Sequence, residues 1–381
     1  MNRSIWRDCL VGLVLMGIVA IVAPLARGSS IVLTDAQREK LGRLVREDAR
    51  ARELFERVAR DADAALAARP DPVAVILTEG KLQSDPVKVR TWESLGDMPK
   101  LGALGYAFAV TGKREYAEKI REFVMAWAKV NHSAGDPIDD TNYEPLLDAY
   151  DVARETFPRH EREVADAWLH GIANEEVRTG SLDKETSFNN WNSHRIKIVG
   201  LIAFVLQDRS MIDGIEKAYR KQIEKNLNPD GSSWDFHKRD ALHYQVYDLE
   251  PLLALCIAAR NNGIDLYDYQ APSGASVAKS VAFVVPFVEG TQQHAEFVHS
   301  TVAFDQQRAA SGQAEYKAGR LWDAHAGLLT MELDEAFDPS VRRLVVKLAG
   351  DKVSAEERGS AGFERFPTWR IVVNEAERGG K

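Results

Sequence analysis

The chain has 381 residues, of which 45% are hydrophobic, and it carries a formal net charge of −8 at pH 7. A chain of this length can bury a large core, and its acidic balance argues against a sequence-independent hold on nucleic acid, which needs a basic surface. An anionic polymer would have to bind in a local basic cleft. Beyond the N-terminal segment only Cys256 remains, so we expect no internal disulfide.

Residues 1–28 are predicted to be a secretory signal peptide. Arg3 and Arg7 precede an apolar run from Cys9 to about Leu25, and small residues follow it. A short membrane anchor is the alternative, because the run is at the lower limit of length for a span. The signal interpretation predicts a periplasmic or secreted protein with no stable membrane partner after cleavage. Residues 29–381 are then expected to form a single domain.

Apolar residues at helical spacing dominate the rest of the chain, and Gly, Pro, Asn and Asp separate the segments. The pattern predicts helices over residues 34–68, 97–111, 113–130, 143–156, 160–178, 190–207, 210–226, 240–262 and 275–288. Residues 340–377 are ambiguous and include candidates for a few short strands. Paired helices with short connections and no obvious repeat predict an all-α fold, an (α/α) toroid or incomplete barrel of paired helices.

A first concentration of polar side chains lies in residues 187–194. Asn190, His194 and Lys197 are spaced by three or four residues, so on a helix that begins near Asn190 they share one face. Amide and imidazole groups suit the neutralisation of a carboxylate and the movement of a proton. The structural alternative makes Asn189 or Asn190 a helix N-cap and His194 a partly exposed polar residue.

A second concentration follows about fifty residues later, in residues 234–244. A turn over residues 228–231 leads into a helix that we expect to start near Lys238, with Arg239, His243 and Tyr247 on one face and Tyr244 beside them. A tyrosine in such a place is often a core residue. Here, however, basic and aromatic groups crowd the helix start, where a purely structural face would be apolar.

Two further segments, 138–145 and 290–297, bring polar and aromatic groups to predicted helix ends, and the polar run 305–308 comes soon after the second. All of them could be ordinary caps and loops. In a toroid, however, the inner helix ends converge, so these segments could meet at one cleft. The sequence contains no His-Glu-x-x-His or paired-Cys pattern, no dinucleotide or phosphate loop and no nucleophile elbow, so we expect neither a metal nor a cofactor.

The order and spacing of these blocks resemble the alginate lyase superfamily of polysaccharide lyases, helical toroids that cleave uronic-acid polymers by β-elimination. The resemblance rests on Asn189-Asn190 with a nearby histidine, and on the run from Arg239 to Tyr244 with residues 248–252 behind it. It covers residues 90–320. Two departures are visible, because Trp191 stands where the family usually has histidine, and His237 stands where it usually has arginine.

The resemblance implies roles for particular residues. Tyr244 is expected to donate a proton to the leaving O4 and, alone or with His194, to remove the C5 proton. Asn190 and Arg239 are expected to neutralise the C5 carboxylate. A wider set is expected to bind the anionic polysaccharide: Asn189, Asn142, Tyr143, Trp191, Trp234, His237, His243, His294 and Glu296. The two departures shift the expected substrate from mannuronate-type alginate towards β-1,4-linked glucuronan.

Two other functions stay open at this stage. The first is a glycoside hydrolase on the same toroid, with two carboxylates such as Asp139 and Asp235 as acid and base. The second is a non-catalytic periplasmic module that binds a polysaccharide. Elimination leaves an unsaturated uronate that absorbs in the ultraviolet, whereas hydrolysis and simple binding do not.

Overall fold

The computed structural model describes residues 31–180 and 184–349, so the predicted signal peptide lies outside the described part. The helices are α1 (Asp35–Glu47), α2 (Ala49–Leu66), α3 (Pro86–Leu95), α4 (Asp97–Thr111), α5 (Arg114–Val130), α6 (Pro137–Asp140), α7 (Glu144–Ala153), α8 (Arg159–Gly180), α9 (Asn190–Leu206), α10 (Arg209–Asn226), α11 (Trp234–Arg239), α12 (Leu242–Asn261), α13 (Val277–Glu289), α14 (Ala303–Ala310), α15 (Leu328–Asp334) and α16 (Arg342–Ala349). Short 3-10 turns cover Thr141–Tyr143, Arg154–Thr156, Glu185–Ser187, Ala314–Tyr316, Ala324–Gly327 and Pro339–Val341. No helix among the described residues is long and apolar enough to cross a membrane.

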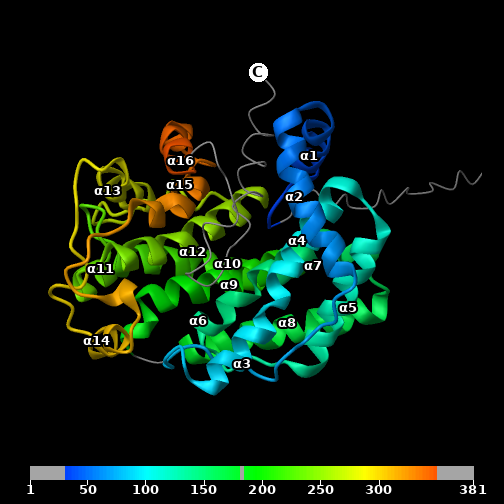
Figure 1. Ribbon diagram of the computed structural model, residues 1–381, viewed down its shortest axis with the longest axis horizontal. Helices are drawn as coiled ribbons and strands as arrows, with labels where there is room; N and C mark the ends of the chain where they lie inside the picture. The colour runs from blue at the N-terminus through cyan, green and yellow to red at the C-terminus, as the bar shows by residue number, and fades with distance from the viewer. Residues whose placement is uncertain (1–30, 181–183, 350–381) are drawn as a thin grey trace, which may run out of the picture.

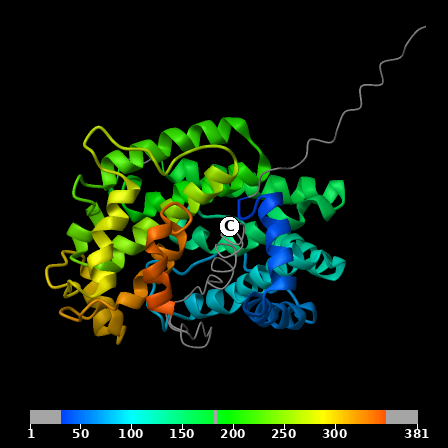
Figure 2. The ribbon, with the colours of Figure 1, turned by 90° about the horizontal axis from the view of Figure 1, so that it is seen from above.

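The helices form the predicted incomplete (α/α) toroid (Figures 1 and 2). Helices α4, α7, α9 and α12 pack successively along an inner row. An outer row covers them, with α5 on α4 and α7, α8 and α10 on α9, and α13 on α12. The blue N-terminal helices and the orange C-terminal helices lie at the two ends of this array, with the green helices between them (Figure 2).

Burial differs between the two rows in the way that their sequences dictate. The outer helix α10 buries one stripe, including Ile212, Ile215 and Ile223, and exposes its charged residues. The inner helix α9 is buried on all sides from Ser193 to Val205. Its part from Ile198 to Val205 is apolar on all sides, and such a helix lies in the interior. The polar residues at the start of α9 are therefore buried as well, and they need partners.

Two of the predicted helices are interrupted. The segment 34–68 is broken at Asp48, whose backbone is extended and whose carboxylate accepts a hydrogen bond from the N–H of Ala51 at 2.7 Å. The segment that we expected to start near Lys238 is broken at Asp240, which adopts a left-handed conformation with φ 48°. Arg239 therefore ends α11, and the prediction that it shares a helix face with His243 was wrong.

The C-terminal prediction is also corrected in part. Arg342–Ala349 form a helix where short strands were a candidate, and the rest of that segment lies outside the described residues. Within residues 31–180 and 184–349 the only β pairings are two isolated bridges, Leu227 with Ser233 and Ala295 with Leu321. The first bridge closes the predicted turn before α11.

Gly231 has φ 93° in this turn, and a Cβ atom there would lie 2.3 Å from the carbonyl oxygen of Lys279. Only glycine fits such a close approach in that conformation. Ser233 then caps α11, since its hydroxyl accepts a hydrogen bond from the N–H of Phe236 at 3.1 Å. The turn thus sets where the second polar motif begins.

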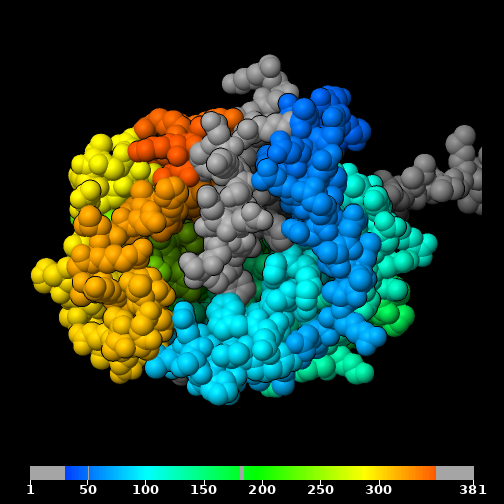
Figure 3. Space-filling model, in the orientation of Figure 1, coloured from blue at the N-terminus to red at the C-terminus, as the bar shows by residue number. Residues whose placement is uncertain are grey.

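The face of the ring drawn in Figure 3 is hollowed between the orange residues of the C-terminal part and the cyan residues of the N-terminal part, and green residues lie at the bottom of the hollow. Contacts between side chains also link the two parts. The guanidinium of Arg308 in α14 lies 3.4 Å from the carboxylate of Glu79, in the loop before α3. Tyr244 lies beside this contact, because Arg308 also donates a hydrogen bond to its hydroxyl.

Candidate active site

Tyr244 of α12 is surrounded by basic and acidic side chains from α11 and α14 and by a second tyrosine, and we call this group the arginine–tyrosine cluster: Arg239, Tyr244, Asp305, Arg308 and Tyr316. Arg308 Nη1 donates a hydrogen bond to the Tyr244 hydroxyl at 3.0 Å. The guanidinium carbon of Arg239 lies 3.9 Å from the centre of the Tyr244 ring. Asp305 accepts a hydrogen bond from Arg239 at 2.5 Å and lies 4.0 Å from Arg308. A phenol is thus held between two cations.

The break between α11 and α12 positions this phenol. Asp240 turns the chain, and α12 begins at Leu242. The carboxylate of Glu296 then accepts hydrogen bonds from the backbone N–H groups of Leu242 at 2.7 Å and His243 at 3.0 Å. A carboxylate at a helix N-terminus accepts hydrogen bonds from the unpaired backbone N–H groups and interacts favourably with the positive end of the helix dipole. Glu296, predicted to bind substrate, therefore has a structural task at the start of α12.

Helix α14 is fixed against the other side of Tyr244. Asp305 accepts a hydrogen bond from the Ser300 hydroxyl at 2.9 Å. The guanidinium of Arg308 stacks over the rings of Phe304 at 4.3 Å and Tyr316 at 4.8 Å. Arginine stacks readily on aromatic faces and keeps its donors in a fixed plane. The donor that faces the Tyr244 hydroxyl is consequently held in place.

Burial and charge act on Tyr244 in opposite directions. Burial is the main cause that raises the pKa of Tyr244 well above its usual value, and Tyr316 adds to it, whereas Arg239 and Arg308 lower it. His243 has its pKa lowered to about 4, first by burial and then by Arg308 and Arg239. His243 is therefore neutral at pH 7, and Tyr244 is protonated.

His194 reaches the same site from α9. Its ring centre lies 4.4 Å from that of Tyr247, which in turn lies 6.3 Å from the ring centre of Tyr244. The Thr141 hydroxyl is 2.9 Å from His194 Nδ1, and Lys197 donates a hydrogen bond to the same hydroxyl at 2.6 Å. His194 is buried with 1% of its surface exposed, so the alternative of a partly exposed polar residue was wrong.

Asn190 belongs to a second group of buried polar residues, which we call the carboxylate–amide network: Asn190, Ser193, Asn226, Asp235 and Asp248. Asp235 accepts hydrogen bonds from the backbone N–H of Asn190 at 2.7 Å and from its side-chain amide. Asn226 lies 3.3 Å from both Asp235 and Asp248, and Ser193 donates to Asp248 at 2.7 Å. Burial raises the pKa of Asp235 to about 6 and that of Asp248 well above its usual value.

Tyr143 does not line an open surface, which corrects the prediction that it stacks on a sugar. Its side chain is fully buried, its ring packs edge-on against Trp127 and Trp168, and its hydroxyl donates to Asn131 at 2.5 Å. Asn142 is also buried and donates its side-chain amide to a backbone carbonyl of its own turn at 2.6 Å. Both residues hold the turn that carries Thr141.

Asn189 is the N-cap of α9, because its side-chain oxygen accepts a hydrogen bond from the N–H of Trp191 at 3.0 Å. The side chains of Trp191 and Trp234 are half-buried, so both keep some ring surface exposed. The ring of Trp234 meets that of Phe188 edge-on at 5.4 Å, and the ammonium of Lys238 lies 5.3 Å from it. These two tryptophans remain the aromatic candidates for sugar stacking.

The remaining predicted histidines lie around α11. His237 is exposed, and its Nε2 is 2.8 Å from the Ser232 hydroxyl. His294 is half-buried, and its Nε2 is 3.1 Å from the carbonyl oxygen of Asp240. His294 thus supports the left-handed turn between Arg239 and Tyr244, whereas His237 lies on the open side of α11.

The two carboxylates of the hydrolase alternative are both occupied by protein donors. Asp139 accepts from the backbone N–H and the hydroxyl of Thr78 at 2.8 and 2.5 Å, and from the N–H of Glu79 at 3.0 Å. Asp235 is buried in the carboxylate–amide network. A glycosidase needs its carboxylates free to meet the glycosidic oxygen and a water or sugar carbon. This arrangement does not suit a hydrolase.

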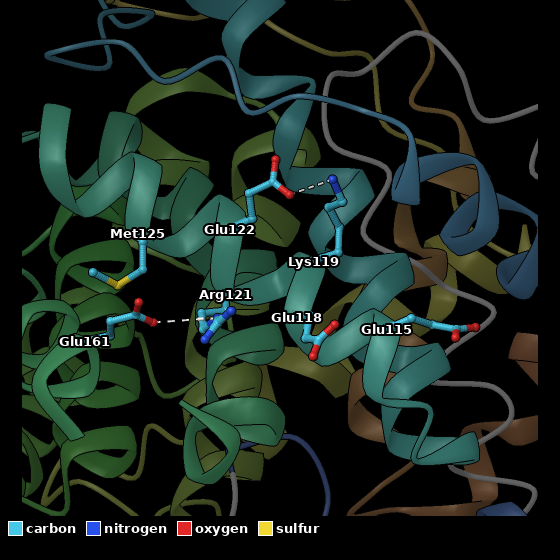
Figure 4. Close-up of a pocket in the computed structure, with 7 residues that line it drawn as sticks. All are labelled: Glu115, Glu118, Lys119, Arg121, Glu122, Met125 and Glu161. Carbon is cyan, nitrogen blue, oxygen red and sulfur yellow. Dashed lines mark hydrogen bonds and ion pairs between the residues drawn. The ribbon is translucent and has the colours of Figure 1, made fainter. Parts of the chain in front are cut away.

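A pocket on the outer surface lies apart from this site, between α5 and the start of α8 (Figure 4). It is lined by Glu115, Glu118, Lys119, Arg121, Glu122, Met125 and Glu161. Its charges pair locally, with Lys119 2.7 Å from Glu122 and Arg121 3.6 Å from Glu161. None of the predicted site residues lines it. Across the described residues, no cluster of three or more His, Cys, Asp or Glu side chains is arranged to hold a metal ion.

Arg308 and Tyr316 were given no role in the sequence prediction. The polar run 305–308 was a visible signal, since it followed the motif at 290–297, but its spacing did not indicate contact with Tyr244. That contact joins residues 64 positions apart. Only the folded structure, which brings the Arg308 side chain of α14 to Tyr244 of α12, reveals it.

Known proteins resemble this chain in sequence and in fold. A curated relative, the exo-oligoalginate lyase of Saccharophagus degradans, is 23% identical over 182 residues, which cover 42% of this chain and 24% of the relative. The chain therefore spans about a quarter of that protein. A solved alginate lyase from Bacteroides ovatus has a TM-score of 0.65 at 16% identity and covers 91% of this chain and 98% of its own.

Alginate lyase A1-III from Sphingomonas species A1 has a TM-score of 0.53 at 21% identity and covers 69% of this chain and 78% of its own. A variant of A1-III complexed with a tetrasaccharide has a TM-score of 0.54 at 19% identity, with 74% and 81% covered. These likenesses confirm the toroid fold. The model of the alginate lyase family matches residues 36–294, which is more than half of the chain. The chain therefore belongs to the alginate lyase family and is classed with the polysaccharide lyases.

Proposed function

We propose that the chain cleaves a β-1,4-linked uronic-acid polymer by β-elimination at the arginine–tyrosine cluster. The observation that carries the proposal is the position of the Tyr244 hydroxyl, 3.0 Å from Arg308 Nη1, with the guanidinium of Arg239 3.9 Å over its ring. A phenol can give and take a proton. Guanidinium groups favour negative charge nearby, either on the phenol oxygen or on a substrate carboxylate.

The reaction breaks the C5–H and C4–O4 bonds and forms a C4=C5 double bond. Neutralisation of the C5 carboxylate makes the C5 proton more acidic, and we assign this to Arg239. Tyr244 then takes the C5 proton as a phenolate and returns it to the departing O4. In the other version, His194 takes the C5 proton and Tyr244 donates its own proton to O4. Asn190 contributes indirectly, because its amide is bound to Asp235.

The substrate class follows from stereochemistry and from the two departures from the family pattern. In D-glucuronate and D-mannuronate the C5 proton and O4 leave from the same side, so Tyr244 alone can serve both. L-Guluronate would need His194 as a separate base. Trp191 and His237 favour glucuronan. Mannuronate-type alginate is the second choice, since the relatives are named for alginate or oligoalginate. The predicted signal would take the enzyme to the periplasm or the medium.

A panel of polymers tests this function. Purified protein would be incubated with glucuronan, polymannuronate, polyguluronate and hyaluronan, and the ultraviolet absorbance of unsaturated uronate would be followed together with chain length. We expect absorbance to rise on glucuronan or polymannuronate. Shortening without absorbance would indicate a hydrolase, and binding without shortening would indicate a non-catalytic module. Either result would contradict the proposal.

A further inference from the structure

Helix α14 lies beyond residues 36–294, the part of the chain that the family model matches, yet it supplies a side chain to the Tyr244 hydroxyl. Arg308 is 8% exposed and donates from Nη1 to that hydroxyl at 3.0 Å. Arg239 makes a different contact, since it lies over the ring and its Nη1 donates to Asp305. Arg308 therefore contacts the hydroxyl of Tyr244, whereas Arg239 contacts its ring.

We propose that Arg308 is a positioning residue that stabilises the tyrosinate form of Tyr244 and thereby makes Tyr244 the base of the reaction. The catalytic part of this inference rests on the proposed function. The effect of Arg308 on the proton of the Tyr244 phenol, however, does not depend on a substrate.

The direction of the effect follows from charge and burial. The neutral phenol accepts one hydrogen bond from Arg308. A phenolate in the same place would in addition be attracted electrostatically to the positive charge of the guanidinium. Such a charge-assisted hydrogen bond is stronger than a neutral one, and a low-dielectric surrounding strengthens it further. Burial of Tyr244 works against the phenolate and raises the pKa. Arg308 offsets that effect at the oxygen atom itself.

The surroundings of Arg308 keep this donor aimed before any substrate arrives. Phe304 and Tyr316 flank its guanidinium at 4.3 and 4.8 Å. The nearest carboxylates are at 3.4 Å in Glu79 and 4.0 Å in Asp305. These are single, rather long ion-pair contacts, whereas a bidentate pair would have two donors at shorter distance. Arg308 Nη1 therefore remains able to donate its hydrogen bond to the Tyr244 hydroxyl.

The test measures the proton on Tyr244 directly. The protein would be labelled with fluorotyrosine, whose phenol is more acidic than that of tyrosine, and followed by fluorine NMR across pH. The chain has 10 tyrosines, and the Tyr244 resonance is the one that disappears in Tyr244→Phe. We expect Arg308→Met to raise the pKa of Tyr244 by about one to three units, the usual effect of one opposite charge. An unchanged titration would overturn the proposal.

Three variants sharpen the result. Arg308→Lys keeps the charge without the planar fork, so the pKa of Tyr244 should lie between the values of the wild type and Arg308→Met. Glu79→Gln removes an anion beside Arg308, so it should leave the pKa unchanged or lower it. Arg159→Met is the surface control, because Arg159 is 86% exposed and pairs with Glu163 in α8. If Arg308→Met does not fold, an Arg308→Lys titration identical to the wild type would overturn the proposal instead.

Kinetics then separate positioning from mere structural support. In Arg308→Met we expect kcat to fall by about 10²-fold, with the alkaline shift of the pH–rate profile matching the NMR shift and KM changing little. A loss confined to KM, with an unshifted profile, would make Arg308 a substrate-binding residue and contradict the proposal. If the wild type cleaves none of the polymers, the proposed function fails, while the NMR titration still decides the role of Arg308.

Discussion

The carboxylate–amide network and the arginine–tyrosine cluster are both buried polar groups near the start of inner helices, yet they differ in how their hydrogen-bonding capacity is used. In the network, Asp235 accepts hydrogen bonds from Asn190 and Asn226 within the core. In the cluster, Arg239 and Arg308 bring two cations to one phenol. Hydrogen bonds between buried polar groups stabilise a fold, whereas charges placed beside an ionisable group shift its pKa, which is characteristic of functional sites.

We therefore expect the network to contribute mainly to stability, and we propose proton transfer only for the cluster. Asn190 lies in the first polar motif of the sequence, but it belongs to the carboxylate–amide network. Arg308 came from a segment without an assigned role, and it belongs to the arginine–tyrosine cluster. Variants in each group test whether the network and the cluster act separately or as one.

The largest effect is expected for Tyr244→Phe, which removes the phenol and little else. Loss of a positioned acid–base group typically costs about 10² to 10⁴ in rate, so we expect kcat to fall within that range. Substrate binding and the thermal unfolding midpoint should change little. The measurement is initial ultraviolet rate at saturating polymer, with binding followed by calorimetry. Turnover close to that of the wild type would remove Tyr244 from the mechanism.

The next effect is on stability. Asp235→Ala leaves two donors of Asn190 and one of Asn226 without their carboxylate. We expect the free energy of unfolding to fall by about 2 kcal/mol or more, while kcat per folded molecule stays within about tenfold. Urea denaturation checks the first statement. The surface control Asp71→Ala removes an exposed pair with Arg90 and should cost less than about 1 kcal/mol. A large loss of kcat in Asp235→Ala protein that remains folded would contradict the separation, because it would show that the network also takes part in catalysis.

A smaller effect is a pH shift from Asp305→Asn. The Asp305 carboxylate raises the pKa of Tyr244, so its neutralisation should lower that pKa. The limb of the pH–rate profile that reports tyrosinate should therefore move to lower pH, by about one unit or less. This direction is opposite to that expected for Arg308→Met. A shift of both variants to the same side would contradict the charge-based account.

The smallest effect concerns stability against pH at His243. Its pKa is lowered to about 4 in the folded protein, so the unfolded chain binds the extra proton first as the pH falls. His243 therefore supports the fold fully above about pH 6.5, its unfolded value, and this support is lost as the pH falls towards 4. The stability difference between the wild type and His243→Gln should shift against the wild type from pH 7 to pH 4.5. A difference that does not change with pH would mean that His243 does not titrate as described.

Much of the fold could be predicted because helical periodicity and capping residues are local signals. Asn189 before α9 is an example, since the cap and the helix start are as the amide pair indicated. The breaks at Asp48 and Asp240 were missed, because each is a single aspartate with no Gly or Pro beside it to mark the end of a helix. The left-handed turn at Asp240 is stabilised by a distant segment, since its carbonyl accepts a hydrogen bond from the N–H of Phe297 at 2.7 Å.

The site was predicted only as far as its motifs could be placed on one helix at a time. His194 and Tyr244 both neighbour the ring of Tyr247, at 4.4 and 6.3 Å between ring centres, and their joint role in catalysis stays a prediction. Tyr143 was misjudged, because sequence does not distinguish an aromatic ring at a cleft from one packed between Trp127 and Trp168. The sequence distance between Tyr244 and Arg308 hides their contact, which depends on the packing of two helices.

The most direct test of the central claim follows the fate of water in the reaction. The wild type and Tyr244→Phe would be incubated in ¹⁸O-labelled water with the polymer that the wild type cleaves, and the products would be analysed by mass and absorbance. The account predicts unsaturated, ultraviolet-absorbing ends without ¹⁸O for the wild type and almost no product for Tyr244→Phe. Saturated ends that carry ¹⁸O, or undiminished cleavage by Tyr244→Phe, would contradict it.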